Sequence, residues 1–342
     1  MKEAGDKRIC IGILGFGNIG VGTYQLLEMN HSHIKETSGL DFEVVRILEK
    51  DVDRPRPVQV APGLYTQDAD SLLTTPDIDI VVELLGGIQP ATDFMLKAMA
   101  AGKHVVTANK AAVAAHFPEL RQAAIANRVL FRYEASVGGG IPILNALTTA
   151  LTANRFIEVK GILNGTTNYI LTRMAEAGLS YEESLAEAQA KGFAEADPTA
   201  DVEGIDVANK LSILISLMFG ERVAPEDIPT VGITGITPKA ILDAAADNSR
   251  IKLIAHAKKT AAGIEYNINP MALPLSHPLA SVSHEFNAIF VTGDGVGDLM
   301  FYGKGAGPLP TGSAVMGDII EIGKAMAKNS AYDPVVPGGP LK

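Results

Sequence analysis

Short apolar runs recur through the first 140 residues of the chain and indicate the strands of a sheet. Stretches with helical spacing separate most of these runs. Such alternation predicts an α/β fold with a parallel, doubly wound sheet of the Rossmann type, whose ligand binds at the carboxyl ends of the strands. The expected strands cover residues 9–14, 42–48, 79–85, 104–107 and 129–133.

The second half of the chain mixes β-rich and helical segments and predicts a second, α+β domain, which we expect to bind the substrate and mediate assembly. We expect the first domain to span residues 1–140 and the second 141–310, with a helix at 311–330 joining the first domain. The second domain is expected to have strands at 156–163, 264–268 and 288–292, and helices at 142–152, from near Thr166, and at 181–190.

A glycine-rich stretch, residues 291–315, has too many glycines for a regular element. We expect a loop whose backbone contacts a ligand, although a set of β-turns would give a similar sequence.

Composition and charge narrow the class of partner. The 342 residues are 47% hydrophobic and 20% charged, which is typical of a globular protein with ample core. The net charge of -10, with scattered basic residues, argues against binding to nucleic acid or to an acidic membrane surface and favours a small-molecule substrate. No apolar run reaches the ~18 residues of a membrane span, and the chain begins without a signal-peptide pattern, so we expect a cytoplasmic protein.

The single cysteine, Cys10, lies in the first apolar run. One cysteine forms no internal disulfide and no cysteine metal site. We expect a buried core thiol.

A glycine turn follows the first expected strand and precedes a helical pattern. In a G-x-G-x-x-G turn the first glycine allows the tight turn, the second lets the backbone approach a pyrophosphate, and the third lets helix and strand pack closely. A glycine-rich turn without a ligand is the alternative, but the strand and helix on the proper sides favour a dinucleotide site. The candidate cofactor-binding residues are Gly15, Phe16, Gly17, Asn18, Ile19 and Gly20.

The end of the second expected strand bears on the choice between NADP and NAD. Glu49 offers an acid for a free ribose hydroxyl, whereas Lys50 offers a cation for a 2'-phosphate. We favour NADP slightly, through Lys50. A solvated loop of charged residues remains an alternative of nearly equal weight.

Lys110 is a candidate because it follows a strand end, with Thr107 and Asn109 as polar neighbours. A lysine at this edge of a parallel sheet reaches both a nicotinamide and a small acidic substrate. The alternative is a surface lysine at a helix terminus.

The stretch from Gly192 to Leu214 gathers acidic residues before a largely apolar helix. Asp206 and Lys210 stand four apart and share one helix face, with Glu203 on the same stripe. An ordinary salt bridge that caps a core helix is the alternative. The excess of acidic groups around one lysine favours a reaction centre.

Five separated stretches and the glycine turn resemble homoserine dehydrogenases, in the order found in that family. The resemblance extends across nearly the whole chain. The stretches are TANK at 107–110, YEASVGGGIPI at 133–143, GILNGTTNYIL at 161–171, FAEADPTADVEGIDVANKL at 193–211 and FYGKGAGPLPTGSAV at 301–315.

The resemblance implies an NAD(P)-dependent, reversible reduction of L-aspartate 4-semialdehyde to L-homoserine, in threonine, methionine and isoleucine biosynthesis. Lys210 then corresponds to the proton donor, Lys110 to its partner lysine at the cofactor, and Asp206 to the residue that positions Lys210 and the reacting oxygen. Glu195 corresponds to the group that holds the substrate ammonium, and Gly303 to a residue that closes over the nicotinamide.

The resemblance also implies a sodium ion and a homodimer. The positions that correspond to the sodium ligands are Glu134, Val137, Gly139 and Ile141. Because the chain ends at Lys342, soon after the last expected helix, we expect it to lack the regulatory extension of many relatives.

Two rival functions are less consistent with the sequence. An aspartate semialdehyde dehydrogenase needs a nucleophilic cysteine in its second domain, where this chain has none. A sensor that binds NAD(P) without turnover has no need of a proton donor such as Lys210.

Overall fold

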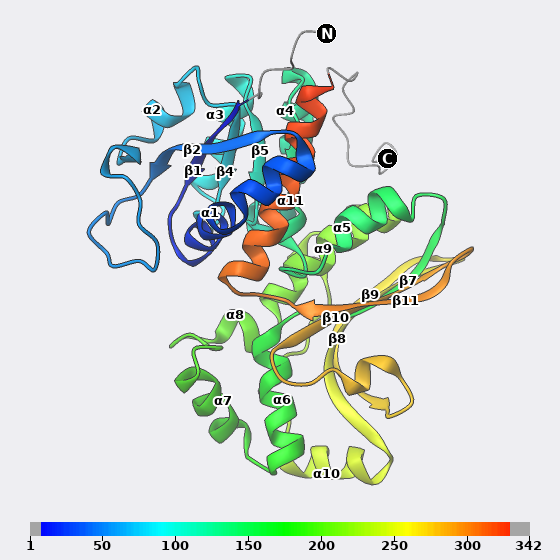
Figure 1. Ribbon diagram of the computed structural model, residues 1–342. Helices are drawn as coiled ribbons and strands as arrows, with labels where there is room; N and C mark the ends of the chain where they lie inside the picture. The colour runs from blue at the N-terminus through cyan, green and yellow to red at the C-terminus, as the bar shows by residue number, and fades with distance from the viewer. Residues whose placement is uncertain (1–7, 329–342) are drawn as a thin grey trace. The chain divides into compact units, whose positions relative to one another are not determined.

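The computed structural model describes residues 8–328, and the chain divides into two compact units (Figure 1). The first unit contains the described residues up to Gly140 together with those from Gly307 onward, and the second contains Ile141–Ala306.

The first unit is built on a six-stranded sheet in the order β3-β2-β1-β4-β5-β6, and its strand pairs are all parallel. The predicted doubly wound sheet is therefore confirmed. The central strand β4, IVVE, is buried along its whole length, as expected for a parallel strand covered on both faces. The strands are β1 Arg8–Leu14, β2 Asp41–Leu48, β3 Tyr65–Thr66, β4 Ile80–Glu83, β5 His104–Thr107 and β6 Phe131–Arg132.

The helices of the first unit include α11, which comes from the end of the described chain and packs along α1. The two backbones approach closely because both contacts are made by glycine: a Cβ at Gly22 would overlap Pro308, and one at Gly312 would lie 2.8 Å from Thr23 N. The helices are α1 Asn18–Ser38, α2 Ala69–Thr74, α3 Ala91–Ala100, α4 Lys110–Asn127 and α11 Pro308–Ala327.

The second unit is built on a five-stranded sheet in the order β11-β10-β7-β8-β9, and its strand pairs are antiparallel. Its strands are β7 Phe156–Ile162, β8 Ser249–Thr260, β9 Gly263–Pro274, β10 Phe286–Gly293 and β11 Gly297–Lys304. Its helices are α5 Ile143–Asn145, α6 Gly165–Ala177, α7 Tyr181–Ala190, α8 Thr199–Val202, α9 Ile205–Phe219 and α10 Pro238–Ala246, with a π-helical turn at Ala146–Ala150.

Two expectations about the second unit were wrong. The glycine-rich stretch is not a loop throughout, because strand β11 lies within it and pairs with β10 over eight positions. The glycines of β11 itself, Gly297 and Gly303, stand at or near its ends, where they interrupt the ladder least. Glu203 does not share the helix of Lys210, since Gly204 adopts a φ of 83° between α8 and α9 and breaks the stripe.

Candidate active site

Lys210 lies on the first turns of α9 and is buried. Its Nζ donates to Asp206 Oδ2 at 2.6 Å and to the carbonyl oxygen of Leu163 at 2.7 Å. Asp206 is in the first turn of α9, where a carboxylate interacts favourably with the helix dipole. The side chains of the pair are only 10% and 8% exposed, so the predicted contact is a desolvated ion pair.

Asn164 connects this pair to the start of α6. Its Nδ2 donates to Asp206 Oδ2 at 2.9 Å and to Asp201 Oδ1 at 2.7 Å, which uses both N–H bonds of the amide. Its Oδ1 accepts from Thr167 N and so caps α6. Asn164 therefore holds Asp206 and the end of β7 in one arrangement.

The other acidic residues of the loop before α9 lie differently. Asp201 also accepts from Thr166 Oγ1 at 2.9 Å, and Asp197 accepts from Thr199. Glu195 is exposed, and Gln189 donates to its backbone carbonyl rather than to its side chain. The loop thus presents Glu195 to solvent in the second unit, while Asp201 joins the network of Asn164.

In the first unit, Lys110 begins α4 directly after the end of β5. Asn109 caps this helix by accepting from Ala112 N, and its Nδ2 donates to Gly87 O. Thr107 accepts from Asn109 N and donates to Glu83 Oε2 at 2.6 Å. The ends of β4 and β5 are thereby tied together a few residues before Lys110 in the chain.

Glu83 is a residue of this strand edge that the sequence analysis did not single out. It is fully buried, and burial raises the pKa of its carboxyl even though hydrogen bonds from Thr107 and from the backbone of Leu85 oppose the rise. The sequence signal that could have identified Glu83 is an acidic residue at the last position of an otherwise apolar strand.

The glycine turn has the geometry that its sequence predicts. Gly15 has a φ of 96°, and a Cβ at Gly20 would overlap the Gly15 carbonyl. No atom lies within 4 Å of a Cβ position at Gly17, the residue that precedes α1. The turn therefore leaves an open approach to the N-terminus of α1, which favours an anionic phosphate. Phe16, by contrast, buries its ring in the core, so that only its backbone faces this turn.

Glu49 follows directly after β2 and pairs with Arg56 at 2.9 Å. Burial opposes its ionisation, but backbone hydrogen bonds and the Arg56 charge outweigh this and lower the pKa of Glu49. Arg56 also donates to the Phe16 carbonyl oxygen. It therefore connects Glu49, at the end of β2, with the glycine turn. Lys50 is exposed beside them.

Two carboxyl groups are buried together near the end of the first unit's sheet. Glu134 lies in a 3-10 turn, Glu134–Ser136, and its backbone N–H donates to Asp318 Oδ2 on α11 at 2.9 Å. Burial raises the pKa of Asp318 well above its ordinary value, and the nearby charge of Glu134 raises it further. Val137 and Gly139 follow on the same segment, whereas Ile141 begins the second unit. Within residues 8–328, no three His, Cys, Asp or Glu side chains form a metal-binding group.

Gly303 lies in β11 opposite Asn287 of β10. Asn287 is 1% exposed, and neither its Nδ2 nor its Oδ1 has a hydrogen-bond partner in the described part of the chain. The sequence analysis did not identify Asn287, because a single asparagine in an apolar strand carries no local signal.

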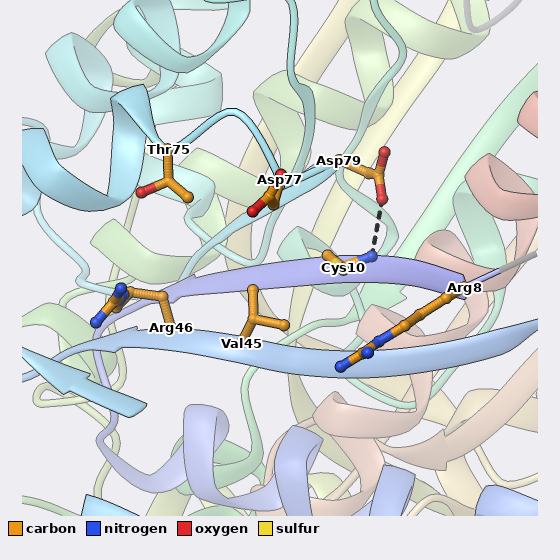
Figure 2. A pocket seen from close by; sticks show the side chains of 7 residues that line it. All are labelled: Arg8, Cys10, Val45, Arg46, Thr75, Asp77 and Asp79. Carbon is orange, nitrogen blue, oxygen red and sulfur yellow. Dashed lines mark hydrogen bonds between the residues drawn. The ribbon is translucent and has the colours of Figure 1, made fainter. Parts of the chain in front are cut away.

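A hollow of about 460 Å³ lies beside β1 and β2 of the first unit (Figure 2). Cys10, Arg8 and Arg46 line it together with Asp77 and Asp79. Cys10 is only partly buried, which corrects the expectation of a core thiol, and its N–H donates to Asp79. Burial and the Asp79 charge raise the pKa of the thiol, which makes it a poor nucleophile.

A helix that spans a membrane must be both long enough and apolar enough. None of the helices between residues 8 and 328 meets both requirements.

Comparison with known proteins places both units in one family. The model of the homoserine dehydrogenase domain matches residues 142–320, and that of the homoserine dehydrogenase NAD-binding domain matches residues 15–134. Homoserine dehydrogenases of Synechocystis sp. and Corynebacterium glutamicum are 43% and 44% identical, over 95% and 96% of this chain and 76% and 74% of theirs.

Solved structures agree with these matches. A homoserine dehydrogenase from Thiobacillus denitrificans has a TM-score of 0.91 at 42% identity, over 95% of this chain and 75% of that one. A hyperthermophilic archaeal homoserine dehydrogenase mutant in complex with NADPH has a TM-score of 0.77 at 25% identity, over 92% of this chain and 98% of that one. An NAD(P)-dependent oxidoreductase that acts on a CH–OH group is thus the function of this fold and site, and the chain belongs to the homoserine dehydrogenase family.

Proposed function

We propose that Lys210 transfers the proton in this reaction and that Asp206 positions it. In the direction of reduction, the bound nicotinamide supplies a hydride to the aldehyde carbon. Charge then develops on the aldehyde oxygen, and the Lys210 ammonium stabilises that charge and gives up a proton to form the hydroxyl of homoserine. In the reverse direction the neutral amine of Lys210 takes the hydroxyl proton.

The observation that carries this proposal is the burial of Lys210 between Asp206 Oδ2 and the Leu163 carbonyl oxygen. Both acceptors fix the direction of the Nζ atom, and a fixed donor loses little orientational freedom when the reaction begins. An exposed lysine would first have to give up water and rotamer freedom. Asn164 restrains Asp206 in turn.

We propose roles for the remaining site residues from the positions that they share with the family's motifs. Glu195, exposed in the loop before α8, is proposed to hold the substrate ammonium. Lys110, fixed at the start of α4 after the tied ends of β4 and β5, is proposed to act at the cofactor edge beside the substrate. Gly303 in β11 is proposed to lie over the nicotinamide.

For the cofactor, we propose that the glycine turn at residues 15–20 binds the diphosphate and that Lys50 favours NADP. Lys50 is exposed, while the neighbouring Glu49 carboxylate is engaged by Arg56. An engaged carboxylate competes less strongly for a ribose hydroxyl. The structure of an archaeal relative with NADPH is in line with this preference.

We propose a sodium ion beside Glu134, held by its carboxylate and by backbone carbonyls of Val137, Gly139 and Ile141. Oxygen ligands of this kind suit a hard cation. The buried carboxyl groups of Glu134 and Asp318 repel one another when both are ionised, so a cation at this segment would relieve an electrostatic cost.

A homodimer formed through the second unit is also proposed, in the cytoplasm. Met300 and Tyr302 of β11 are exposed apolar side chains on one face of the sheet. Covering such side chains with a second copy of the chain removes apolar surface from water and stabilises the assembly. Light scattering of the purified protein measures the assembly directly.

The activity test compares wild type with Lys210→Ala, and uses Lys239→Ala as a matched control. Lys239 also pairs with an aspartate four residues away but is exposed. We expect wild type and Lys239→Ala to oxidise NADPH or NADH with L-aspartate 4-semialdehyde, at rates whose ratio gives the cofactor preference. Lys210→Ala should lose at least about 100-fold in kcat while still binding cofactor. Full turnover in Lys210→Ala would reject the proton-transfer role.

A further inference from the structure

Asn287 combines nearly complete burial with a carboxamide that no described group satisfies. It is 1% exposed, and both its Nδ2 and its Oδ1 lack hydrogen-bond partners. A primary amide carries two N–H donors and an acceptor oxygen. A buried polar group without partners destabilises the folded state, and native proteins satisfy most such groups, with a ligand or ordered water where the protein supplies none.

The strand register places Asn287 beside the residue that holds Lys210. Ala288 of β10 pairs with Ile162, the last residue of β7, so Asn287 and Leu163 each lie one residue beyond this pair. The Leu163 carbonyl oxygen accepts from Lys210 Nζ at 2.7 Å. Because paired strands lie about 4.8 Å apart, the backbones of Asn287 and Leu163 leave this pair from neighbouring positions.

Two glycines make room for the carboxamide without satisfying it. Gly303 is the partner of Asn287 on β11 and brings no side chain of its own, and the nearest atom to a Cβ position at Gly303 is the apolar Ile141 Cγ1, at 3.2 Å. A Cβ at Gly305 would overlap the Asn287 carboxamide. The carboxamide therefore packs over the backbone of Gly305, and neither of its polar atoms has a partner among residues 8–328.

We infer that Asn287 is a further substrate-contacting residue, whose carboxamide forms hydrogen bonds with polar groups of the small amino acid on which Lys210 acts. The inference rests on the proposed function of Lys210. Asn287 pairs with Gly303, which is proposed to lie over the nicotinamide, and also lies one residue beyond the strand pair that ends next to Leu163, the acceptor of Lys210. We assign its carboxamide to the substrate through Leu163, and the KM values below separate the substrate from the nicotinamide.

The test replaces the carboxamide with groups of similar size. Asn287→Leu removes every hydrogen bond, and Asn287→Asp keeps an acceptor but removes the donors. We expect both variants to raise the KM for L-homoserine by about tenfold or more, because a site that has lost a bond to a charged group binds less tightly by that order. The KM for the cofactor should stay within twofold of wild type. L-homoserine should also raise the Tm of wild type more than that of either variant.

Ser184→Ala is the control for a buried polar atom outside the site. Ser184 in α7 is fully buried and its Oγ also lacks a partner. Its removal should leave both KM values unchanged.

Each other outcome overturns the inference in a different way. A rise confined to the KM for the cofactor would assign the amide to the nicotinamide. A higher Tm for Asn287→Leu with both KM values unchanged would show that the amide contacts neither substrate nor cofactor and only destabilises the folded protein. If Asn287→Leu does not fold, the KM values of Asn287→Asp decide between the same outcomes. Absence of turnover in wild type would instead reject the proposed function.

Discussion

Helices α9 and α10 each carry a lysine and an aspartate four residues apart, with an Nζ to Oδ2 distance of 2.6 Å in both. The side chains of Lys210 and Asp206 on α9 are 10% and 8% exposed, whereas those of Lys239 and Asp243 on α10 are 81% and 62% exposed. The spacing is identical, and the surroundings are not. An exposed pair of this kind contributes about 0.3 to 0.5 kcal/mol.

The α9 pair differs because distant residues complete it. Leu163 and Asn164, more than 40 residues earlier in the chain, donate to or accept from its members. With water largely excluded, the interaction of the two charges is stronger than at the surface. The comparison shows that helical spacing brings the charged groups together, while tertiary contacts decide whether the pair is a surface feature or part of a reaction centre.

The largest expected effect follows from neutralising the aspartate of each pair. Asp206→Asn removes the charge that fixes the Lys210 ammonium, and a misplaced proton donor lowers kcat by on the order of 100-fold. Asp243→Asn should change kcat by less than twofold. Steady-state kinetics of both variants measures the difference. Similar losses in the two variants would mean that burial does not distinguish the pairs.

A smaller effect is expected from Asn164→Ala. This variant loses the bonds to Asp206 and Asp201 and the cap of α6, so we expect kcat to fall about tenfold and stability to fall by about 3 kcal/mol. Ser180→Ala is the matched control, because Ser180 caps α7 in the same way but touches neither residue. It should lose about 1 kcal/mol of stability in a denaturant titration, the share expected of the cap alone, and keep full kcat. A Ser180→Ala variant with the same loss of kcat would assign the effect of Asn164 to helix capping alone.

Much of the first unit could be predicted from sequence because residues close together in the chain determine its strands and its glycine turn. Each parallel strand is a short apolar run, and the turn at Gly15 needs its glycines for reasons that a few neighbouring residues determine. The α9 pair was also predictable, because residues four apart on a helix meet whatever surrounds them.

The remainder depends on contacts between segments far apart in sequence. Strand β8 was not predicted, and β11 was mistaken for a loop, because each is stabilised by an antiparallel partner rather than by its own pattern. Asn164 meets Asp206 across 42 positions, and no spacing rule anticipates that bond. The break at Gly204 was readable in principle, since glycine favours a positive φ, but the apolar residues beyond it suggested one continuous helix.

A third lysine, Lys252, tests what burial does when no carboxylate pairs with it. Lys252 in β8 is 2% exposed and donates to Asn168 Oδ1 and to the Val282 carbonyl oxygen, which are both uncharged. Burial, followed by repulsion from Arg250, lowers its pKa from 10.5 to about 8. Between these two values the unfolded chain binds more protons at this position than the folded one, so this lysine makes stability rise with pH, by at most about 1.4 kcal/mol per pH unit.

The smallest expected effect is therefore a difference in pH dependence without a change in turnover. Between pH 8 and pH 9, the free energy of unfolding of wild type should rise relative to that of Lys252→Met by about 1 kcal/mol, measured by urea titration at both pH values. Lys239→Met, which removes an exposed lysine, should parallel wild type, and kcat should stay within twofold in both variants. If wild type and Lys252→Met show equal slopes, Lys252 keeps an ordinary pKa. Burial alone would then not give a lysine of this protein unusual properties. The hydrogen bonds of Lys210 to Asp206 and Leu163 would have to explain why Lys210 affects kcat and Lys239 does not.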